Sequence, residues 1–164
     1  MNLSHDLIPI PLGVFAVAFD GSGAIHASAF GDLAALQSRL GDGHAMAVRA
    51  PHAGARRQLA AYFAGERRDF DLPLAPAGSP FQLRVWSALR EIPCGETRSY
   101  ANLAAVLRSS PRAVGRANAT NPICLFIPCH RVIGADGALT GYAFGTDLKR
   151  RLLEHETASG RRAA

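Results

Sequence analysis

The first half of the chain shows strand-like spacing of apolar residues near its start. Residues 12–19 form an apolar, β-prone run, and residues 24–30 alternate loosely between apolar and polar side chains. Residues 20–23, with the sequence Asp-Gly-Ser-Gly, carry turn-forming side chains between the two runs. Because two β-prone runs joined by glycine and aspartate are typical of paired strands, this stretch predicts a β-hairpin.

Helical spacing follows the hairpin. Asp32 is placed to cap a short helix whose apolar residues share one face: Leu33, Leu36 and Leu40. A second helix is predicted over residues 55–64, with Leu59, Tyr62 and Phe63 facing inward and Gly65 ending it. We therefore expect residues 1–74 to form a small N-terminal α/β domain with a β-hairpin or antiparallel sheet.

Prolines and glycines mark residues 72–80 as a linker, after which helical spacing resumes. Ser79 and Gln82 have the spacing of a capping box, which indicates a helix beginning there. The apolar residues that follow recur on one helical face: Phe81, Val85 and Leu89. We expect a mainly helical C-terminal domain over residues 75–164, which makes the fold class α+β.

Two short helices with three residues between them have the outline of a helix-turn-helix. Ser99 is placed to cap a helix over residues 100–107, and Ser110 is placed to cap another over residues 111–119. The second helix is expected to expose two arginines with small residues between them: Arg112, Arg116, Ala113, Ala117 and Ala119. An ordinary helical hairpin is the alternative, and the basic side chains favour a nucleic-acid surface instead.

Residues 127–132, Ile-Pro-Cys-His-Arg-Val, carry the most reactive chemistry in the chain. We expect a buried strand over residues 123–127 to end at a proline and to present Cys129 where the next segment begins. A thiolate is a strong nucleophile, and the adjacent cationic side chains would stabilise it. A buried structural cysteine is the alternative. Neighbouring side chains of an extended chain point to opposite sides, so His130 would need a bend or one bridging water to take the thiol proton.

The last part of the chain is predicted to contain a ligand-facing loop and a helix. Residues 141–145, Gly-Tyr-Ala-Phe-Gly, form a loop whose glycines allow close approach and whose aromatic rings can stack on a base. A helix capped by Asp147 is expected to reach Glu156, with the residues from Thr157 onward frayed. Glu156 is a candidate to orient the far nitrogen of His130.

Charge is divided unevenly along the sequence. Residues 1–78 hold 6 Arg against 7 acidic residues, a balance of −1, whereas residues 79–164 hold 12 Lys and Arg against 6 acidic residues, a balance of +6. The basic second half favours a polyanionic partner. A hydrophobic content of 48% excludes a disordered chain.

Several classes of protein fit the pattern poorly. No apolar run approaches a membrane span and no secretory leader pattern is visible, so we expect a cytoplasmic protein with no membrane partner. Three cysteines do not make a disulfide framework, and Cys124 is expected to point into the core. His26, His44 and His52 lack ligand spacing, so no metal is expected. A cofactor-dependent cytosine methyltransferase would need a glycine-rich cofactor domain, and a nuclease would need clustered carboxylates.

The combined motifs resemble those of the O6-alkylguanine-DNA alkyltransferases. The likeness covers residues 79–156 and includes residues 81–89, 92–97, 112–115 and 127–132, together with Ser99-Tyr100, Asn121-Pro122, Gly141-Tyr142 and residues 152–156. The first 75 residues match that family only in outline, and the resemblance implies a ribonuclease-H-like N-terminal domain.

The resemblance implies irreversible, single-turnover DNA repair without a cofactor. Cys129 would take the alkyl group from O6-alkylguanine, and from O4-alkylthymine, after the base is rotated out of the duplex. His130 and Glu156 would handle the thiol proton, Asn121 would fix the turn around them, and Tyr100 would assist rotation and donate a proton.

The resemblance also assigns the binding surfaces. The helix-turn-helix would enter the minor groove of double-stranded DNA, with Arg112 in the gap left by the base and Ala113, Arg116 and Ala117 beside it. The guanine pocket would be lined by the residues Val132, Gly141, Tyr142, Ala143 and Phe144. Phe144 would narrow that pocket and favour methyl over benzyl adducts. We expect a monomer and leave cooperative binding along DNA open.

Two other functions remain alternatives at this point. A non-catalytic binder of alkylated DNA would use the same helix-turn-helix, but Cys129 would then have no purpose. A helix-turn-helix regulator would explain the basic second half without explaining residues 128–131. Loss of alkyl transfer with retained DNA binding on Cys129→Ser separates both from the repair function.

Overall fold

The computed structural model describes residues 1–163, apart from the side chains at residues 47 and 161–163. The chain divides into two compact units. Unit 1 comprises Met1–Ala77 with Pro122–Cys124, and unit 2 comprises Gly78–Asn121 with Leu125–Ala164. An N-terminal sheet followed by a mainly helical part is the predicted α+β class, which is confirmed, whereas the predicted domain boundary after residue 74 stays a prediction.

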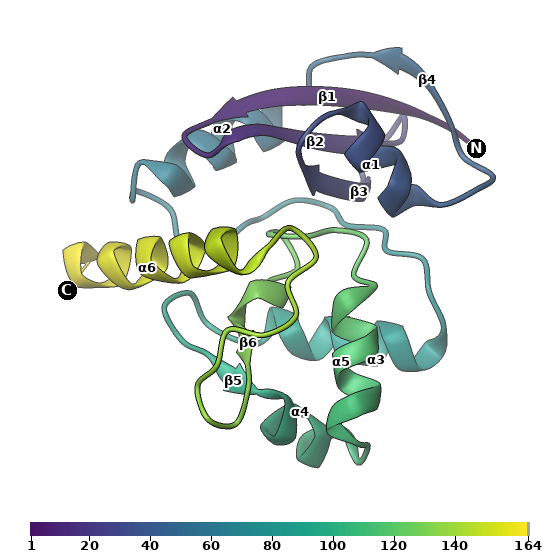
Figure 1. Ribbon diagram of the computed structural model, residues 1–164. Helices are drawn as coiled ribbons and strands as arrows, with labels where there is room; N and C mark the ends of the chain where they lie inside the picture. Colours follow the sequence, from purple (N-terminus) through teal and green to yellow (C-terminus); the bar gives the residue numbers. More distant parts are fainter. Residues whose placement is uncertain (164) are drawn as a thin grey trace. The chain divides into compact units, whose positions relative to one another are not determined.

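Unit 1 is built on a four-stranded sheet with the order β3-β2-β1-β4 (Figure 1). Its strands are β1 (Asn2–Ile10), β2 (Gly13–Phe19), β3 (Ile25–Phe30) and β4 (Ala45–Arg49). β2 pairs antiparallel with both β1 and β3, while β4 pairs parallel with β1. The predicted hairpin is therefore confirmed as β2 and β3. The sequence patterns did not predict β1 or β4.

Two helices pack against this sheet, α1 (Leu33–Leu40) against β2 and β3, and α2 (Ala53–Phe63) against β1. Asp32 caps α1, as predicted, by accepting from the Ala35 backbone N. His52 caps α2, with its Nδ1 accepting from the Ala55 N at 3.0 Å. The expectation that His52 is structural is thus met, and among the described residues there is no cluster of side chains that could hold a metal.

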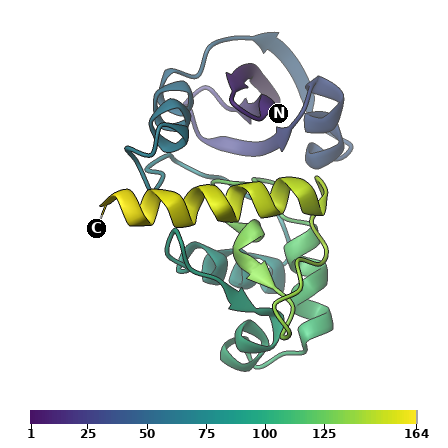
Figure 2. The ribbon, with the colours of Figure 1, turned by 60° about the vertical axis from the view of Figure 1, so that its left-hand side comes forward.

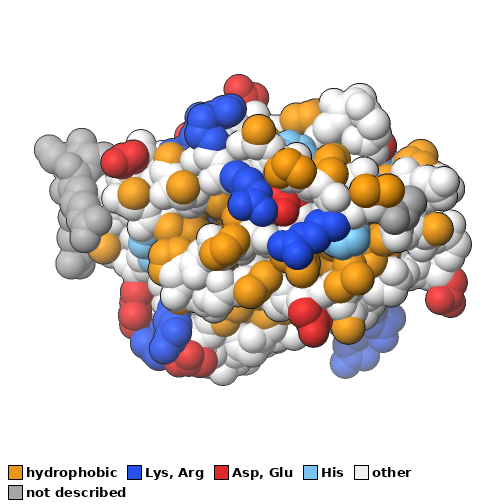
Figure 3. All heavy atoms as spheres, turned by 90° about the horizontal axis from the view of Figure 1, so that it is seen from above, with side chains coloured by type: hydrophobic (Ala, Val, Ile, Leu, Met, Phe, Trp, Pro, Cys, Tyr) orange, Lys and Arg blue, Asp and Glu red, His pale blue; other side chains and the backbone are white. Residues whose placement is uncertain are grey.

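The surface of the molecule drawn in Figure 3 mixes cationic, acidic and hydrophobic side chains rather than gathering one charge. Within residues 1–163, no helix is both long and apolar enough to cross a bilayer.

Unit 2 contains four helices in its described part, α3 (Pro80–Arg90), α4 (Tyr100–Leu107), α5 (Pro111–Ala119) and α6 (Thr146–Ala163), and a short parallel pair, β5 (Arg98–Ser99) and β6 (Val132–Ile133). The predicted capping box of Ser79 and Gln82 is present at the start of α3. A second capping box, of Ser99 and Asn102, begins α4. Both satisfy helix-end N–H groups that would otherwise lack partners.

The predicted helix-turn-helix is present as α4, a turn at residues 108–110, and α5. Arg108 ends α4 in the left-handed region, with a φ of 52°, and Ser110 caps α5. The Trp86 Nε1 donates to the Ala117 carbonyl at 2.8 Å and so fixes α5 against α3. A buried indole N–H needs such an acceptor, so this bond also sets how α5 is held.

Two sequence predictions about unit 2 are wrong. Residues 123–127 do not form a strand, because Leu125 has a φ of 71°, and the segment makes only isolated bridges and a turn. The last helix begins at Thr146 and continues to Ala163, so Asp147 lies inside its first turn and the residues after Glu156 are helical. Thr157 bonds the Leu153 carbonyl within that helix, at 2.9 Å. The straight course of α6 is visible in Figure 2.

Candidate active site

Cys129 lies on a tight 3₁₀ turn, η1 (Cys129–Arg131), rather than after a strand. The backbone N of Cys129 donates to the Ile127 carbonyl at 2.8 Å, and that carbonyl also accepts from the Asn121 Nδ2 at 2.9 Å. Asn121 is buried. It therefore fastens the chain just before the thiol, which is the place where the sequence predicted it. Because the segment is a turn, the alternation expected of an extended chain does not apply to Cys129 and His130.

Cys129 is largely buried, with 5% of the residue exposed. Asn118 on α5 donates from Nδ2 to the Cys129 carbonyl at 3.3 Å. Tyr100 on α4 and Lys149 on α6 both interact electrostatically with Cys129. Cys129 thus lies within electrostatic range of a phenol and an ammonium group, and a positive charge such as that of Lys149 favours a thiolate over a thiol.

Tyr100 and Lys149 meet at one backbone oxygen. The Thr140 carbonyl accepts from the Tyr100 hydroxyl at 3.3 Å and from the Lys149 Nζ at 2.9 Å. Burial raises the pKa of Tyr100, and Asn118 opposes this effect by hydrogen bonding. Burial lowers the pKa of Lys149, and the nearby Cys129 opposes that shift. A phenol with a raised pKa remains a proton donor at neutral pH.

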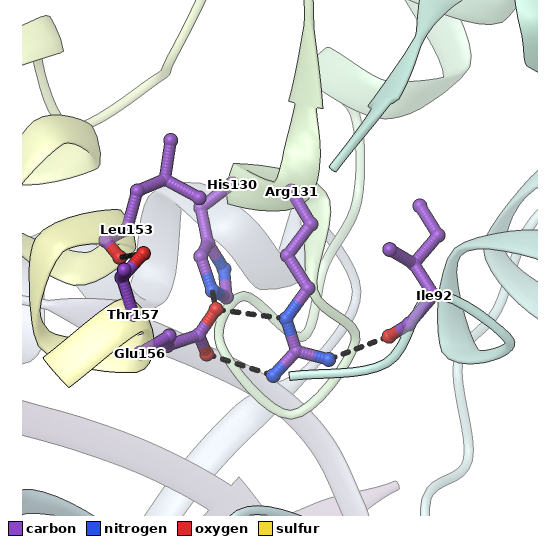
Figure 4. A network of polar contacts seen from close by, with 6 residues as sticks. All are labelled: Ile92, His130, Arg131, Leu153, Glu156 and Thr157. Carbon is purple, nitrogen blue, oxygen red and sulfur yellow. Dashed lines mark hydrogen bonds and ion pairs between the residues drawn. The ribbon is translucent and has the colours of Figure 1, made fainter. Parts of the chain in front are cut away.

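His130 and Arg131 converge on Glu156 of α6 (Figure 4). The His130 Nε2 lies 3.0 Å from Glu156 Oε1, and the Arg131 guanidinium holds both carboxylate oxygens, at 2.9 and 2.7 Å. All three side chains are buried. Burial by itself would raise the pKa of Glu156, but His130 and Arg131 together hold that pKa well below its usual range. The carboxylate predicted to orient His130 is therefore beside it.

The predicted pocket residues lie on β6 and on the loop before α6. Val132 is fully buried, Tyr142 is nearly so, Phe144 is half-buried, and Gly141 and Ala143 are exposed. The rings of Tyr142 and Phe144 meet edge to face, with centroids 5.6 Å apart. A Cβ at Gly141, where φ is 71°, would lie 3.5 Å from the Tyr100 hydroxyl. The loop therefore approaches the tyrosine that the sequence placed at the same site.

The outer side of α5 presents Arg112 and Arg116, both exposed, as the sequence predicted. Ala113 is half-buried beside them. The expectation that Ala117 is exposed is wrong, because only 3% of it is accessible. Ala117 instead lines a groove of about 380 Å³ between α3 and α5, together with residues that include Gln82 and Arg116.

The sequence prediction missed three side chains of this site: Asn118, Arg131 as a partner of Glu156, and Lys149. Lys149 had a signal, because it is the only lysine in a chain with 18 Lys and Arg residues. It also lies seven residues before Glu156, so both fall on the inward face of one amphipathic helix. A charged residue on an apolar helical face is unusual unless it is paired.

Comparison with protein-family models gives two matches. Residues 3–76 match the model described as 6-O-methylguanine DNA methyltransferase, ribonuclease-like domain. Residues 80–158 match the model described as 6-O-methylguanine DNA methyltransferase, DNA binding domain. The two matches together take in most of the sequence.

Two similar proteins are methylated-DNA–protein-cysteine methyltransferases. The methylated-DNA–protein-cysteine methyltransferase of Methanosarcina acetivorans is 58% identical over 104 residues, which cover 62% of this chain and 67% of that protein. The constitutive methylated-DNA–protein-cysteine methyltransferase of Bacillus subtilis is 54% identical over 110 residues, covering 65% of this chain and 67% of that protein. The matched segment therefore spans about two thirds of each relative's length.

A solved structure is similar over almost the whole chain. The Mycobacterium tuberculosis OGT, crystallised in complex with DNA, is 40% identical and superposes with a TM-score of 0.83. The superposition covers 95% of this chain and 94% of that one. The similarity thus includes both units.

Proposed function

Because the chain belongs to the 6-O-methylguanine DNA methyltransferase family, we propose that it repairs O6-alkylguanine in DNA by irreversible transfer of the alkyl group to Cys129. O4-alkylthymine is the second expected substrate. The observation that supports the proposal is that Cys129 and His130 share one 3₁₀ turn, with His130 bonded to Glu156 and with Tyr100 and Lys149 interacting electrostatically with Cys129. One transfer consumes one protein molecule, since a thioether has no easy leaving route.

The transfer is a direct displacement at carbon. The thiol proton of Cys129 passes to His130, directly or through one water, and the sulfur attacks the alkyl carbon. As the S–C bond forms, the C–O6 bond breaks and its electron pair passes to the guanine. The Tyr100 hydroxyl gives the guanine a proton and recovers one from solvent. Lys149 favours the ionised sulfur by its positive charge, and Asn121 keeps the turn in place.

Double-stranded DNA is the proposed partner, approached by α5 from the minor groove. Arg112 is exposed and free of the buried core, which suits the side chain that fills the gap left by an extruded base. Arg116 and the neighbouring Ala113 would lie along the backbone of the DNA. We expect binding as a monomer, with cooperative binding along DNA as a second arrangement.

The extruded guanine would lie between Val132 and the loop at residues 141–144. Tyr142 would form one wall, and Phe144 would restrict the space left for the alkyl group, so methyl adducts should react faster than benzyl adducts. Residues 75–164 would carry this chemistry and residues 1–74 would form the separate N-terminal domain. We expect the protein to act in the cytoplasm.

The test is mass spectrometry of the protein after incubation with duplex DNA containing one O6-methylguanine. Expected is one added methyl group on Cys129, at a stoichiometry of one per repaired lesion. Cys129→Ser should lose transfer and keep DNA binding, whereas Cys94→Ala, which removes a second buried cysteine in the turn after α3, should keep both. Lesion binding by the wild-type protein with Cys129 unmodified would instead support the non-catalytic binder.

A further inference from the structure

Arg131 makes more contacts with the Glu156 carboxylate than His130 does. Its Nε donates to Glu156 Oε1 at 2.9 Å, and its Nη2 donates to Oε2 at 2.7 Å. Its remaining terminal nitrogen, Nη1, donates to the Ile92 carbonyl just after α3, at 2.7 Å (Figure 4). The guanidinium plane is therefore fixed at both ends, and it fixes the carboxylate plane in turn.

The two donors share one oxygen. Glu156 Oε1 accepts from Arg131 and also faces His130 Nε2, at 3.0 Å. An oxygen that already accepts a charged hydrogen bond is a weaker base, so a proton on Nε2 stays on the imidazole and is not passed to the carboxylate. Glu156 and Arg131 are both buried, so solvent does not weaken this pairing.

This arrangement decides which nitrogen of His130 is available. With Nε2 protonated and directed at the carboxylate, Nδ1 is left as the unprotonated nitrogen, and it has no hydrogen-bond partner among the described residues. Nδ1 is therefore the atom that can receive the Cys129 proton. The tautomer depends on Glu156 remaining an anion, because a protonated carboxyl would donate to Nε2 and send the imidazole proton to Nδ1.

We propose that Arg131 is a positioning residue of the alkyl transfer: it holds Glu156 as an anion and thereby keeps His130 Nδ1 free to accept the thiol proton. The inference rests on the proposed function and goes beyond it, because it assigns the protonation state of the relay to an arginine that is hydrogen-bonded to Glu156 and Ile92. The other titratable groups nearby, Tyr100 of α4 and Lys149 of α6, act on Cys129 rather than on the carboxylate.

The pH dependence of the transfer rate tests this. Without the guanidinium, burial raises the pKa of Glu156, so the inactive tautomer forms at a higher pH. In Arg131→Met, the acid-side fall of the rate should move up by about one pH unit or more, with a loss of about 100-fold at neutral pH. Arg131→Lys keeps the positive charge but cannot donate to both carboxylate oxygens in the same way. Its acid-side fall in rate should therefore lie between those of the wild type and Arg131→Met.

A matched control is available in unit 1, where Arg56 holds the buried Asp6 in the same two-point fashion. Arg56→Met should keep the wild-type rate and the wild-type acid limb. A purely structural role for Arg131 predicts instead that Arg131→Met is slow at every pH with an unmoved acid limb, and that result would overturn the proposal. A wild-type protein that transfers no alkyl group refutes the proposed function itself, which is a different outcome.

A measurement on the wild-type protein covers the case in which the variants do not fold. ¹⁵N NMR of the histidine rings, assigned by comparison with His130→Gln, should show the neutral His130 ring protonated on Nε2 and unprotonated on Nδ1. A neutral His130 carrying its proton on Nδ1 would refute the role given to Arg131, whatever the transfer rate is.

Discussion

Each unit contains one buried carboxylate held by an arginine, and the two sites differ in the histidine beside them. In unit 1, Asp6 accepts from the Arg56 guanidinium at 2.7 and 2.6 Å and from the His52 backbone N at 2.9 Å. In unit 2, Glu156 accepts from the Arg131 guanidinium and faces the His130 ring. Similar ionic pairing therefore serves both units.

The histidines are used differently. Both ring nitrogens of His52 are occupied, Nδ1 by the Ala55 N at 3.0 Å and Nε2 by the Gly23 carbonyl at 2.9 Å. His130 uses Nε2 on Glu156 and leaves Nδ1 without a partner in the described part of the chain. A histidine with two occupied nitrogens stabilises a fold, whereas one with an oriented ring and an uncommitted nitrogen can move a proton.

The arginines differ in exposure as well. The Arg56 side chain is 41% exposed, whereas that of Arg131 is 6% exposed. When its carboxylate partner is removed, the exposed Arg56 guanidinium can form hydrogen bonds to water instead. Water cannot reach the buried Arg131 guanidinium in the same way. The pair in unit 2 is therefore expected to be the more sensitive to substitution.

The largest expected difference between the sites is in Glu156→Gln compared with Asp6→Asn. Glu156→Gln leaves Arg131 buried without its counter-charge, which should cost about 3–5 kcal/mol of unfolding free energy. It should also lower the alkyl-transfer rate by about 100-fold, because His130 loses the anion that orients it. Asp6→Asn should cost about 1–2 kcal/mol and leave the rate unchanged. Urea denaturation and single-turnover transfer assays measure the two effects.

The comparison fails if both substitutions lower the rate to the same degree after correction for the folded fraction. In that event the carboxylate of unit 2 would matter only for folding. Hydrogen exchange in each unit distinguishes local from global loss, because two compact units need not unfold together.

The contrast between the two carboxylates also shows what the sequence could predict. Capping residues and short-range spacing predicted α1, α3, α4 and α5 closely, because the signals for those helices lie within a few residues of the helix ends. Cys129, His130 and Glu156 were also chosen from the sequence, the last from its place on the final helix and from the family resemblance.

Contacts between distant segments were not predictable in the same way. β1 and β4 pair across about 40 residues, and neither has a strong alternating pattern, so only tertiary pairing reveals them. The apolar run at residues 123–127 suggested a strand, yet the left-handed Leu125 turns it aside. Arg131 was seen only as a neighbour of the thiol, because its bond to Ile92 depends on the position of α3.

A smaller effect is expected from substitution of Lys149. This buried cation distinguishes unit 2 from the Asp6 site, because no lysine is among the residues bonded to Asp6. Lys149→Met should slow the reaction of Cys129 with iodoacetamide by about tenfold at neutral pH, because the sulfur loses a nearby positive charge. In the wild-type protein the advantage should fade as the pH rises through the Lys149 pKa, which burial lowers below 10.5.

The free energy of unfolding of Lys149→Met should not fall, although the reactivity of Cys129 does. A lysine whose pKa is lowered by folding makes the folded state less stable while it is charged, so Lys149→Met should be at least as stable as the wild type at neutral pH. Peptide mapping separates the labelling of Cys129 from that of Cys94 and Cys124. An unchanged labelling rate at Cys129 would remove Lys149 from the proposed site.

The smallest expected effect is the acid response of the two carboxylates. The pKa of Glu156 is lowered from its ordinary 4.5, and that of Asp6 from 3.8. In acid, the unfolded chain therefore binds protons that the folded chain does not, so the stabilisation from each group is present above its ordinary pKa and is lost as the pH falls. The loss should begin near pH 4.5 in unit 2 and near pH 3.8 in unit 1, at no more than about 1.4 kcal/mol per pH unit for each group.

Because the exposed Arg56 weakens its pairing through solvent screening, Asp6→Asn should flatten the acid response of unit 1 less than Glu156→Gln flattens that of unit 2. Hydrogen exchange at a series of acidic pH values reads the two units separately, and equal flattening in both would show that burial of the arginine does not set the strength of these pairs.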